Sequence, residues 1–244
     1  MNDDPLQPSQ YLRDRMKFME ASEGRRLRAY DDQTGRNVKD GEATKGFVSV
    51  GIGFNMDAPD SRLIWEDTFG DKLSFDDVYA GKIKMSDSQV DTLFNSSAVR
   101  TEDFLNKAFK GTDLASHQRL GLFSMAYQNK NLIGPALAQA VKDGDMKAAT
   151  DEILVRSNRQ QDQRLLPRRY REAAMFNGDG NDLPSFAQYQ TTMRERWGGK
   201  GDAHAPFHNQ TMAQTPVEQT ANPSLTPGAV EIEGLVPLGP ENLD

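Results

Sequence analysis

The chain has 244 residues, 36% of them hydrophobic and 27% charged, which is the usual composition of a soluble globular protein. It contains no cysteine, which excludes disulfides, thiol catalysis and thiolate metal sites. The formal net charge of −7 argues against nucleic acid as a partner, no apolar run is long enough to suggest a membrane span, and the acidic N-terminus does not resemble a signal peptide.

The first element is predicted to be a helix over residues 10–22, where apolar side chains recur at helical spacing. Gly24 is well placed to end this helix in a left-handed cap, so that Glu23 becomes its last residue. A short strand is expected next at 27–30, followed by a cluster of turn-forming residues.

A second strand is predicted from the alternation that follows. Its β-branched residues lie on one face, and a serine and two glycines lie on the other: Val48, Val50 and Ile52 against Ser49, Gly51 and Gly53. A face made of serine and glycine is one that another group can approach closely.

Beyond Asp60 the pattern is helical almost throughout. Ser86 and Gln89 have the spacing of a capping box, and the apolar stripe behind them predicts a helix to about residue 110, long enough to bridge two lobes. Further helices are expected at about 114–129, 135–142, 146–156, 167–176 and 185–197.

The character of the chain changes after Trp197. Residues 198–244 hold six of the twelve prolines, carry one lysine against six acidic residues, and show no sustained period. We therefore expect a globular domain at 1–197 and a Pro-rich acidic tail at 198–244, extended or disordered, as a candidate docking segment.

Two carboxyl groups and one hydroxyl stand out in the first sixty residues: Glu23 at the helix end, Asp32 in the turn and Ser49 on the second strand. Hydrolysis of a glycosidic bond needs one acid to protonate the leaving oxygen and a second group to hold water. Each of the three residues alone also fits a plain structural role. Asp31, directly before Asp32, leaves the choice of the second carboxylate open by one position.

Residues 23–32 (EGRRLRAYDD), followed by 49–53 (SVGIG), resemble the motif of the phage-type lysozymes, the muramidases of the T-even phage endolysin family. The resemblance covers about residues 10–197 and implies a mostly helical, lysozyme-like α+β fold. A small hairpin lobe at about 24–56 and a helical lobe at about 60–197 would be joined by the long helix. It also implies Glu23, Asp32 and Ser49 as the catalytic trio, with serine in place of the family's threonine.

Further residues are carried over by the same resemblance. Arg168 falls where the family has an arginine that pairs with the catalytic glutamate, Tyr127 and Gln128 match positions that line the cleft, and Asn55 stands at its mouth. Tyr127 fits a core position equally well. The chain departs from the family in its longer connection at 33–48, and it has no histidine directly after the glycine-rich strand.

The activity implied is inverting hydrolysis of the β-1,4 bond between N-acetylmuramic acid and N-acetylglucosamine in bacterial peptidoglycan, without cofactor or metal. The expected place of action is the cell wall, reached from a phage virion or from the host cytoplasm, with 198–244 docking on a tail or internal virion protein. Two alternatives stay open. One is a lytic transglycosylase on a related fold, and the other is a virion structural or peptidoglycan-binding protein with an inactive lysozyme domain.

Overall fold

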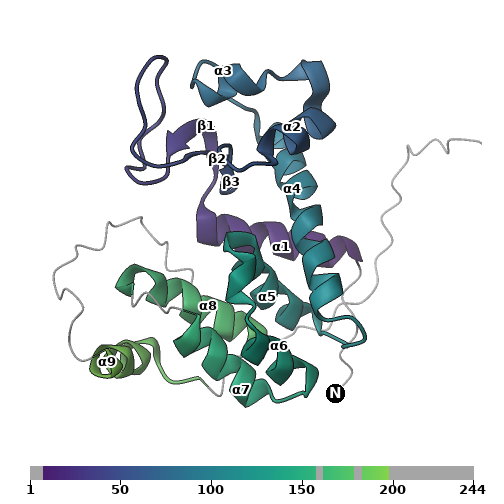
Figure 1. The fold of residues 1–244 in the computed structure, drawn as a ribbon, viewed down its shortest axis with the longest axis vertical. Coiled ribbons are helices and arrows are strands. Elements are labelled where there is room, and N and C mark those ends of the chain that lie inside the picture. The colour runs from purple at the N-terminus through teal and green to yellow at the C-terminus, as the bar shows by residue number, and fades with distance from the viewer. Residues whose placement is uncertain (1–7, 158–161, 179–182, 198–244) are drawn as a thin grey trace, which may run out of the picture. The chain divides into compact units, whose positions relative to one another are not determined.

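The computed structural model describes residues 8–157, 162–178 and 183–197, which all belong to one compact unit of the chain, Met1–His204. The tail expected at 198–244 lies outside the described residues, so its extent and its docking role stay predictions. The predicted fold class is confirmed, because the described chain is mostly helical with one small antiparallel sheet (Figure 1). No helix in these ranges is both long enough and apolar enough to cross a membrane.

The first helix, α1 (Pro8–Glu23), is followed by a three-stranded antiparallel sheet. Its strands lie in chain order: β1 (Arg26–Asp31), β2 (Val48–Gly51) and β3 (Phe54–Asn55). The prediction that the second strand continues through Ile52 and Gly53 is wrong, because β2 ends at Gly51 and the chain turns back into β3. Both glycines of this turn have φ of 68°, a left-handed conformation that residues with a Cβ resist, so the strand reverses here.

The long connection between β1 and β2 covers the other edge of β1. Part of it runs antiparallel beside that strand, with a bridge between Tyr30 and Asn37 and a 2.9 Å hydrogen bond from the Val38 N–H to the Ala29 carbonyl. Gly81 packs so tightly against the Val38 carbonyl that a side chain there would collide with it. Backbone contacts therefore bind this connection to the protein, and it protects a sheet edge.

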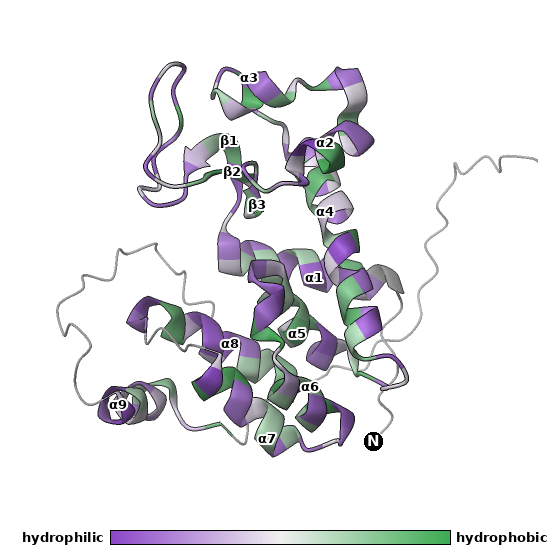
Figure 2. Cartoon of the chain, in the orientation of Figure 1, coloured by the Kyte–Doolittle hydropathy of each residue, from purple (hydrophilic) through white to green (hydrophobic). Residues whose placement is uncertain are grey.

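The helix α4 (Asp87–Ala108) is the long helix predicted from the capping sequence. The Gln89 N–H donates to Ser86 Oγ at 3.2 Å, and the Ser86 N–H donates to Gln89 Oε1 at 2.8 Å, so both halves of the box are present. Near its start Val90 lies next to Gly51 of β2, and farther along the helix packs on α5. Figure 1 shows α4 running from the sheet to the other helices, and Figure 2 shows hydrophilic and hydrophobic residues side by side along it, as expected for one buried face. The two lobes are thus joined as predicted.

The other predicted helices are present, within a few residues of their expected ends. The segment expected as one helix at 146–156 is α7 followed by a π-helical turn, Glu152–Arg156. These predicted helices are α5 (Ser116–Gln128), α6 (Pro135–Lys142), α7 (Met146–Asp151), α8 (Leu166–Asn177) and α9 (Phe186–Arg196). Two more, α2 (Ser61–Phe69) and α3 (Phe75–Tyr79), lie in the stretch after Asp60 for which no helix bounds were predicted.

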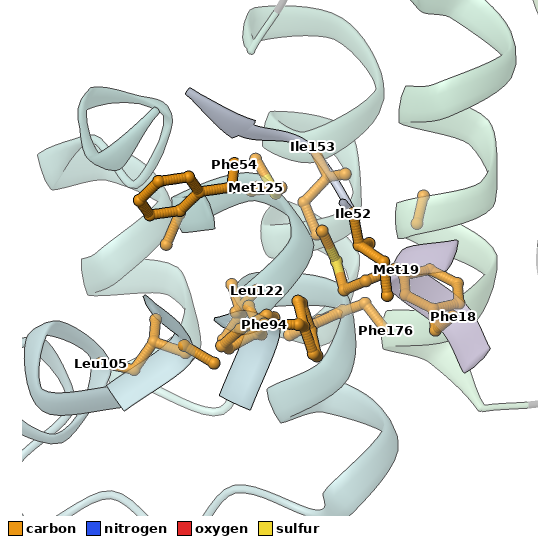
Figure 3. Packing of buried hydrophobic residues seen from close by; sticks show 14 of the residues in the cluster. Phe18, Met19, Ile52, Phe54, Phe94, Leu105, Leu122, Met125, Ile153 and Phe176 are labelled. Atoms are coloured by element: carbon orange, nitrogen blue, oxygen red, sulfur yellow. The ribbon is translucent and has the colours of Figure 1, made fainter. Parts of the chain in front are cut away.

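One cluster of buried apolar side chains joins the sheet to the helices in the described chain. Figure 3 shows part of it, with Phe18 and Met19 of α1 beside Ile52 of the turn, and with Phe94 of α4 and Phe176 of α8. Met19 is fully buried, only a turn of helix before the end of α1. Because close packing fixes this last part of α1, it also fixes where the helix delivers its final residue.

Candidate active site

Glu23 lies where α1 ends, against the turn between β2 and β3. The helix stops here because Gly24 takes φ of 76°, and its N–H donates to the Glu20 carbonyl at 2.8 Å. A Cβ on Gly53 would lie 3.0 Å from Cγ of Glu23 and 3.1 Å from its Oε2, so only glycine lets the turn approach this carboxyl so closely. The Glu23 side chain is 20% exposed, which makes it a largely enclosed acid that a ligand can still reach.

Arg168 of α8 holds the Oε1 oxygen of the Glu23 carboxyl. Its Nη1 lies 2.7 Å from that oxygen, its Nε donates to Glu172 Oε1 at 3.0 Å, and its Nη2 donates to the Ser124 carbonyl at 3.2 Å. Burial opposes the charge of this guanidinium, but the two carboxylates outweigh it and raise the pKa of Arg168 above its ordinary value. A planar guanidinium anchored at three points fixes the direction of the carboxyl that it binds. This is the contact that the resemblance implied.

A row of polar side chains crosses one face of the sheet. Tyr30 of β1 lies opposite Ser49 of β2, and Ser49 lies opposite Asn55 of β3. Residues directly opposite each other in antiparallel strands point to the same face. Asp32 comes two residues after Tyr30 and shares that face, and its N–H extends the ladder by donating to the Phe47 carbonyl at 2.9 Å. Three of the predicted site residues, Asp32, Ser49 and Asn55, are therefore brought to one face.

The two adjacent aspartates have different surroundings. The carboxylate of Asp31 is buried and accepts backbone N–H groups from both ends of the β1–β2 connection, those of Gln33, Thr34, Lys45 and Gly46. These donors, the Lys45 N–H most of all, hold the pKa of Asp31 below its ordinary range. Asp32 is exposed, and its Oδ1 accepts the Phe47 N–H at 2.8 Å. Asp31 thus closes the connection, and Asp32 is the aspartate that faces solvent.

Tyr30 is a site residue that sequence reasoning missed. Its ring lies under the Arg26 guanidinium, with Cζ 5.2 Å from the ring centroid, and the residue lies opposite Ser49 in the sheet. Burial raises the pKa of Tyr30, and the charges of Glu23 and Asp32 raise it further, so this phenol stays protonated at neutral pH. Both carboxylates therefore act on the same phenol. The available signal was its position two residues before Asp32 on an alternating strand.

Tyr127 of α5 packs in the helical lobe and contacts the turn between β2 and β3. Its ring centroid lies 5.7 Å from that of Phe94 and 5.7 Å from that of Phe123. Its hydroxyl donates to the Ile52 carbonyl at 3.0 Å, and burial raises its pKa. The hydroxyl is thus engaged within the protein, and it ties α5 to the turn that faces Glu23.

Gln128 and Asn55 lie at two different places. Gln128 is exposed and accepts a hydrogen bond from Arg169 beside a cavity of about 570 Å³, which Glu23, Asp32 and Ser49 do not line. Asn55 is partly exposed, and its Oδ1 accepts the following Asp57 N–H at 2.8 Å, which orients its amide on the polar sheet face. In the part of the chain that the structure describes, no cluster of three or more His, Asp or Glu side chains could hold a metal ion.

No protein-family model matches the chain, and neither does any curated protein. Among solved structures 22 chains match. One is the crystal structure of a mutant P22 lysozyme, which is 20% identical to this chain, with a TM-score of 0.49, over 68% of this chain and 96% of that one. A likeness at this level assigns no activity, so the roles of Glu23, Asp32 and Ser49 stay predictions.

Proposed function

We propose that the protein is a peptidoglycan hydrolase that cleaves the β-1,4 bond between N-acetylmuramic acid and N-acetylglucosamine with inversion. The observation that carries the proposal is geometric: Arg168 anchors Glu23 against Gly53 in the turn after β2, and Asp32 shares a sheet face with Ser49 of that strand. Two carboxyl groups with different surroundings are what inverting cleavage of a glycosidic bond requires, one as acid and one as base.

In this proposal Glu23 protonates the leaving oxygen. Arg168 occupies its Oε1, so Oε2, on the side of Gly53, is the oxygen that carries the proton. A general acid must lie within hydrogen-bonding reach of the atom it protonates, and the three anchors of Arg168 favour one direction of the carboxyl. Because an ion pair favours the ionised carboxylate, we infer that the hold of Arg168 loosens as substrate enters.

Asp32 and Ser49 hold the attacking water on the opposite side of the sugar. The Phe47 N–H restrains the Asp32 carboxylate while the side chain stays exposed to solvent. Serine keeps the hydroxyl but lacks the methyl group that stiffens a threonine at χ1. Inverting enzymes leave roughly 6.5–9.5 Å between the two carboxyl groups, which is room for that water.

Mass spectrometry of the fragments released from purified peptidoglycan tests this function. The intact protein should release fragments with reducing muramic acid ends, one water heavier than the anhydro form, and Glu23→Gln should release none. Anhydro ends would make the protein a lytic transglycosylase and would remove the water-holding role from Asp32 and Ser49. No fragments from folded wild-type protein would refute the enzymatic proposal.

We further propose that the protein reaches the cell wall as part of a phage, in the virion or as an endolysin, and that residues 198–244 dock on a tail or internal virion protein. The acidic, Pro-rich composition of this segment supports a role separate from the reaction. Deleting 198–244 should spare hydrolysis and release the protein from purified particles. Retention of the shortened protein in purified particles would refute the docking proposal.

A further inference from the structure

Phe47 is an aromatic side chain that the fold leaves in water. It is 58% exposed, and it is the aromatic member of the four large apolar side chains that are exposed in the described chain: Leu12, Phe47, Leu63 and Val99. Scattered single exposed apolar residues are normal on a protein surface. The position of Phe47 in the sheet is what distinguishes it from the other three.

Phe47 lies directly beside the predicted water-holding residues. The register that pairs Tyr30 with Ser49 continues one step further to pair Asp32 with Phe47, so Phe47 and Asp32 lie opposite each other on the polar face. Phe47 directly precedes β2 and lies two residues before Ser49 in extended chain, which again places both side chains on one face. The exposed ring therefore lies on the same sheet face as Asp32, Asn55 and the buried Ser49.

The backbone under this ring is held firmly. The Phe47 carbonyl accepts the Asp32 N–H at 2.9 Å, and the Phe47 N–H donates to Asp32 Oδ1 at 2.8 Å. The next residue is fixed as well, because the Val48 N–H donates to Asp57 Oδ2 at 2.6 Å. An exposed aromatic side chain on a restrained backbone loses little conformational freedom when a ligand covers it.

A sugar ring is a ligand whose chemistry matches this surface. A pyranose has an apolar face of C–H groups that can lie on an aromatic ring, and a rim of hydroxyl and amide groups that need hydrogen-bond partners. Phe47 supplies the apolar platform, and the exposed Asp32 and the partly exposed Asn55 supply polar groups on the same face. Ligand sites combine such apolar contact with a few placed polar groups.

We propose that Phe47 is a sugar-stacking residue that binds the face of a pyranose unit of the glycan next to the bond to be cleaved. It sets how tightly the glycan is held at the Asp32 side of the site. The identity of the glycan as peptidoglycan rests on the proposed function, whereas the stacking itself rests on the exposure and register of Phe47.

The test uses the full-length protein and peptide-free glycan strands prepared from purified peptidoglycan. Binding is measured in the Glu23→Gln background with Phe47→Ala and Phe47→Tyr added separately, and KM and kcat are measured with the same changes in the active protein. Phe47→Ala should bind the strands roughly tenfold more weakly and raise KM with little change in kcat. The reason is that an aromatic contact stabilises the bound substrate and the transition state equally. Phe47→Tyr should restore binding. Val99→Ala, which removes an equally exposed side chain from α4, should behave as the parent.

The outcomes separate this proposal from the function it builds on. If the wild-type protein hydrolyses peptidoglycan and Phe47→Ala leaves both KM and strand binding unchanged, the stacking role is overturned and the proposed function stands. Wild-type protein that releases no fragments but binds strands in a Phe47-dependent way would refute hydrolysis and support stacking. A Glu23→Gln parent that binds no strands, or a Phe47→Tyr variant as weak as Phe47→Ala, would overturn the stacking proposal.

Discussion

Gly53→Ala should lower the rate of hydrolysis through Glu23, and Gly51→Ala should not. The two glycines flank the same turn and share a φ of 68°, so alanine at either position introduces the same left-handed strain, roughly 1–2 kcal/mol. They differ in what the new Cβ meets. At Gly53 it would lie 3.0 Å from Glu23 Cγ and 3.1 Å from Oε2, whereas at Gly51 it would make an ordinary contact with Val90 at 3.5 Å.

The size of the effect follows from how far Glu23 must move. Carbon atoms in contact normally lie about 3.5–4.0 Å apart, so the Glu23 side chain must shift by about half an ångström. Arg168 holds Oε1 at 2.7 Å, and the carboxyl therefore cannot shift without lengthening this ion pair. A misplacement of about 1 Å can cost roughly a hundredfold in rate, so half of that shift predicts about a tenfold loss of kcat.

Both variants are compared in denaturant unfolding and in release of reducing ends from peptidoglycan. We expect a similar loss of unfolding free energy in the two variants, about 1–2 kcal/mol, and a tenfold loss of kcat in Gly53→Ala alone. An equal loss of kcat in Gly51→Ala would show that the turn as a whole matters and that contact with Glu23 does not. Unchanged kcat in Gly53→Ala would remove Glu23 from the reaction or show that it moves freely.

Two further predictions concern the first strand. Tyr30→Phe removes the hydroxyl on which the charges of Glu23 and Asp32 act but keeps the ring, so unfolding free energy should fall by only about 1 kcal/mol while kcat falls several-fold at unchanged KM; equal kcat in steady-state assays would contradict a positioning role. The pKa of Asp31 is lowered by its backbone donors, so its contribution to stability is present above about pH 4 and is lost as the pH falls through the lower folded pKa. Urea unfolding from pH 6 to 2 should show this loss of stability at acid pH in wild type and less of it in Asp31→Asn. Parallel curves of unfolding free energy against pH would refute the stabilising role of the Asp31 carboxylate.

The helix ends were predictable because local chemistry decides them. Ser86 and Gln89 satisfy each other's backbone groups wherever the helix packs, and Gly24 can adopt the left-handed cap that other residues resist. Glu23 was therefore placed at the end of α1 by sequence alone. The contact between Glu23 and Arg168 was expected only through the resemblance, since no periodicity relates two residues that far apart in the chain.

The second strand was predicted too long because a buried turn residue continued the alternating pattern of apolar residues. Ile52 is 1% exposed, like Val48 and Val50, yet it belongs to the turn. Its side chain points into the core because Tyr127 and the helical lobe approach the turn from that side. A period-2 pattern records which side chains are buried, and it cannot distinguish a strand residue from a buried turn residue.

The alternation of side chains along a strand does explain why the adjacent Asp31 and Asp32 have different surroundings. Successive side chains of a strand point to opposite faces, and Tyr30 faces Ser49, so only Asp32 can share the polar face while Asp31 points away from it. On that opposite side, Asp31 meets the backbone at both ends of the β1–β2 connection and closes it. A connection as long as the one between β1 and β2 needs such a closure. The long connection and the doubled aspartate are therefore best understood together, with Asp31 holding the connection in place and Asp32 left exposed to solvent.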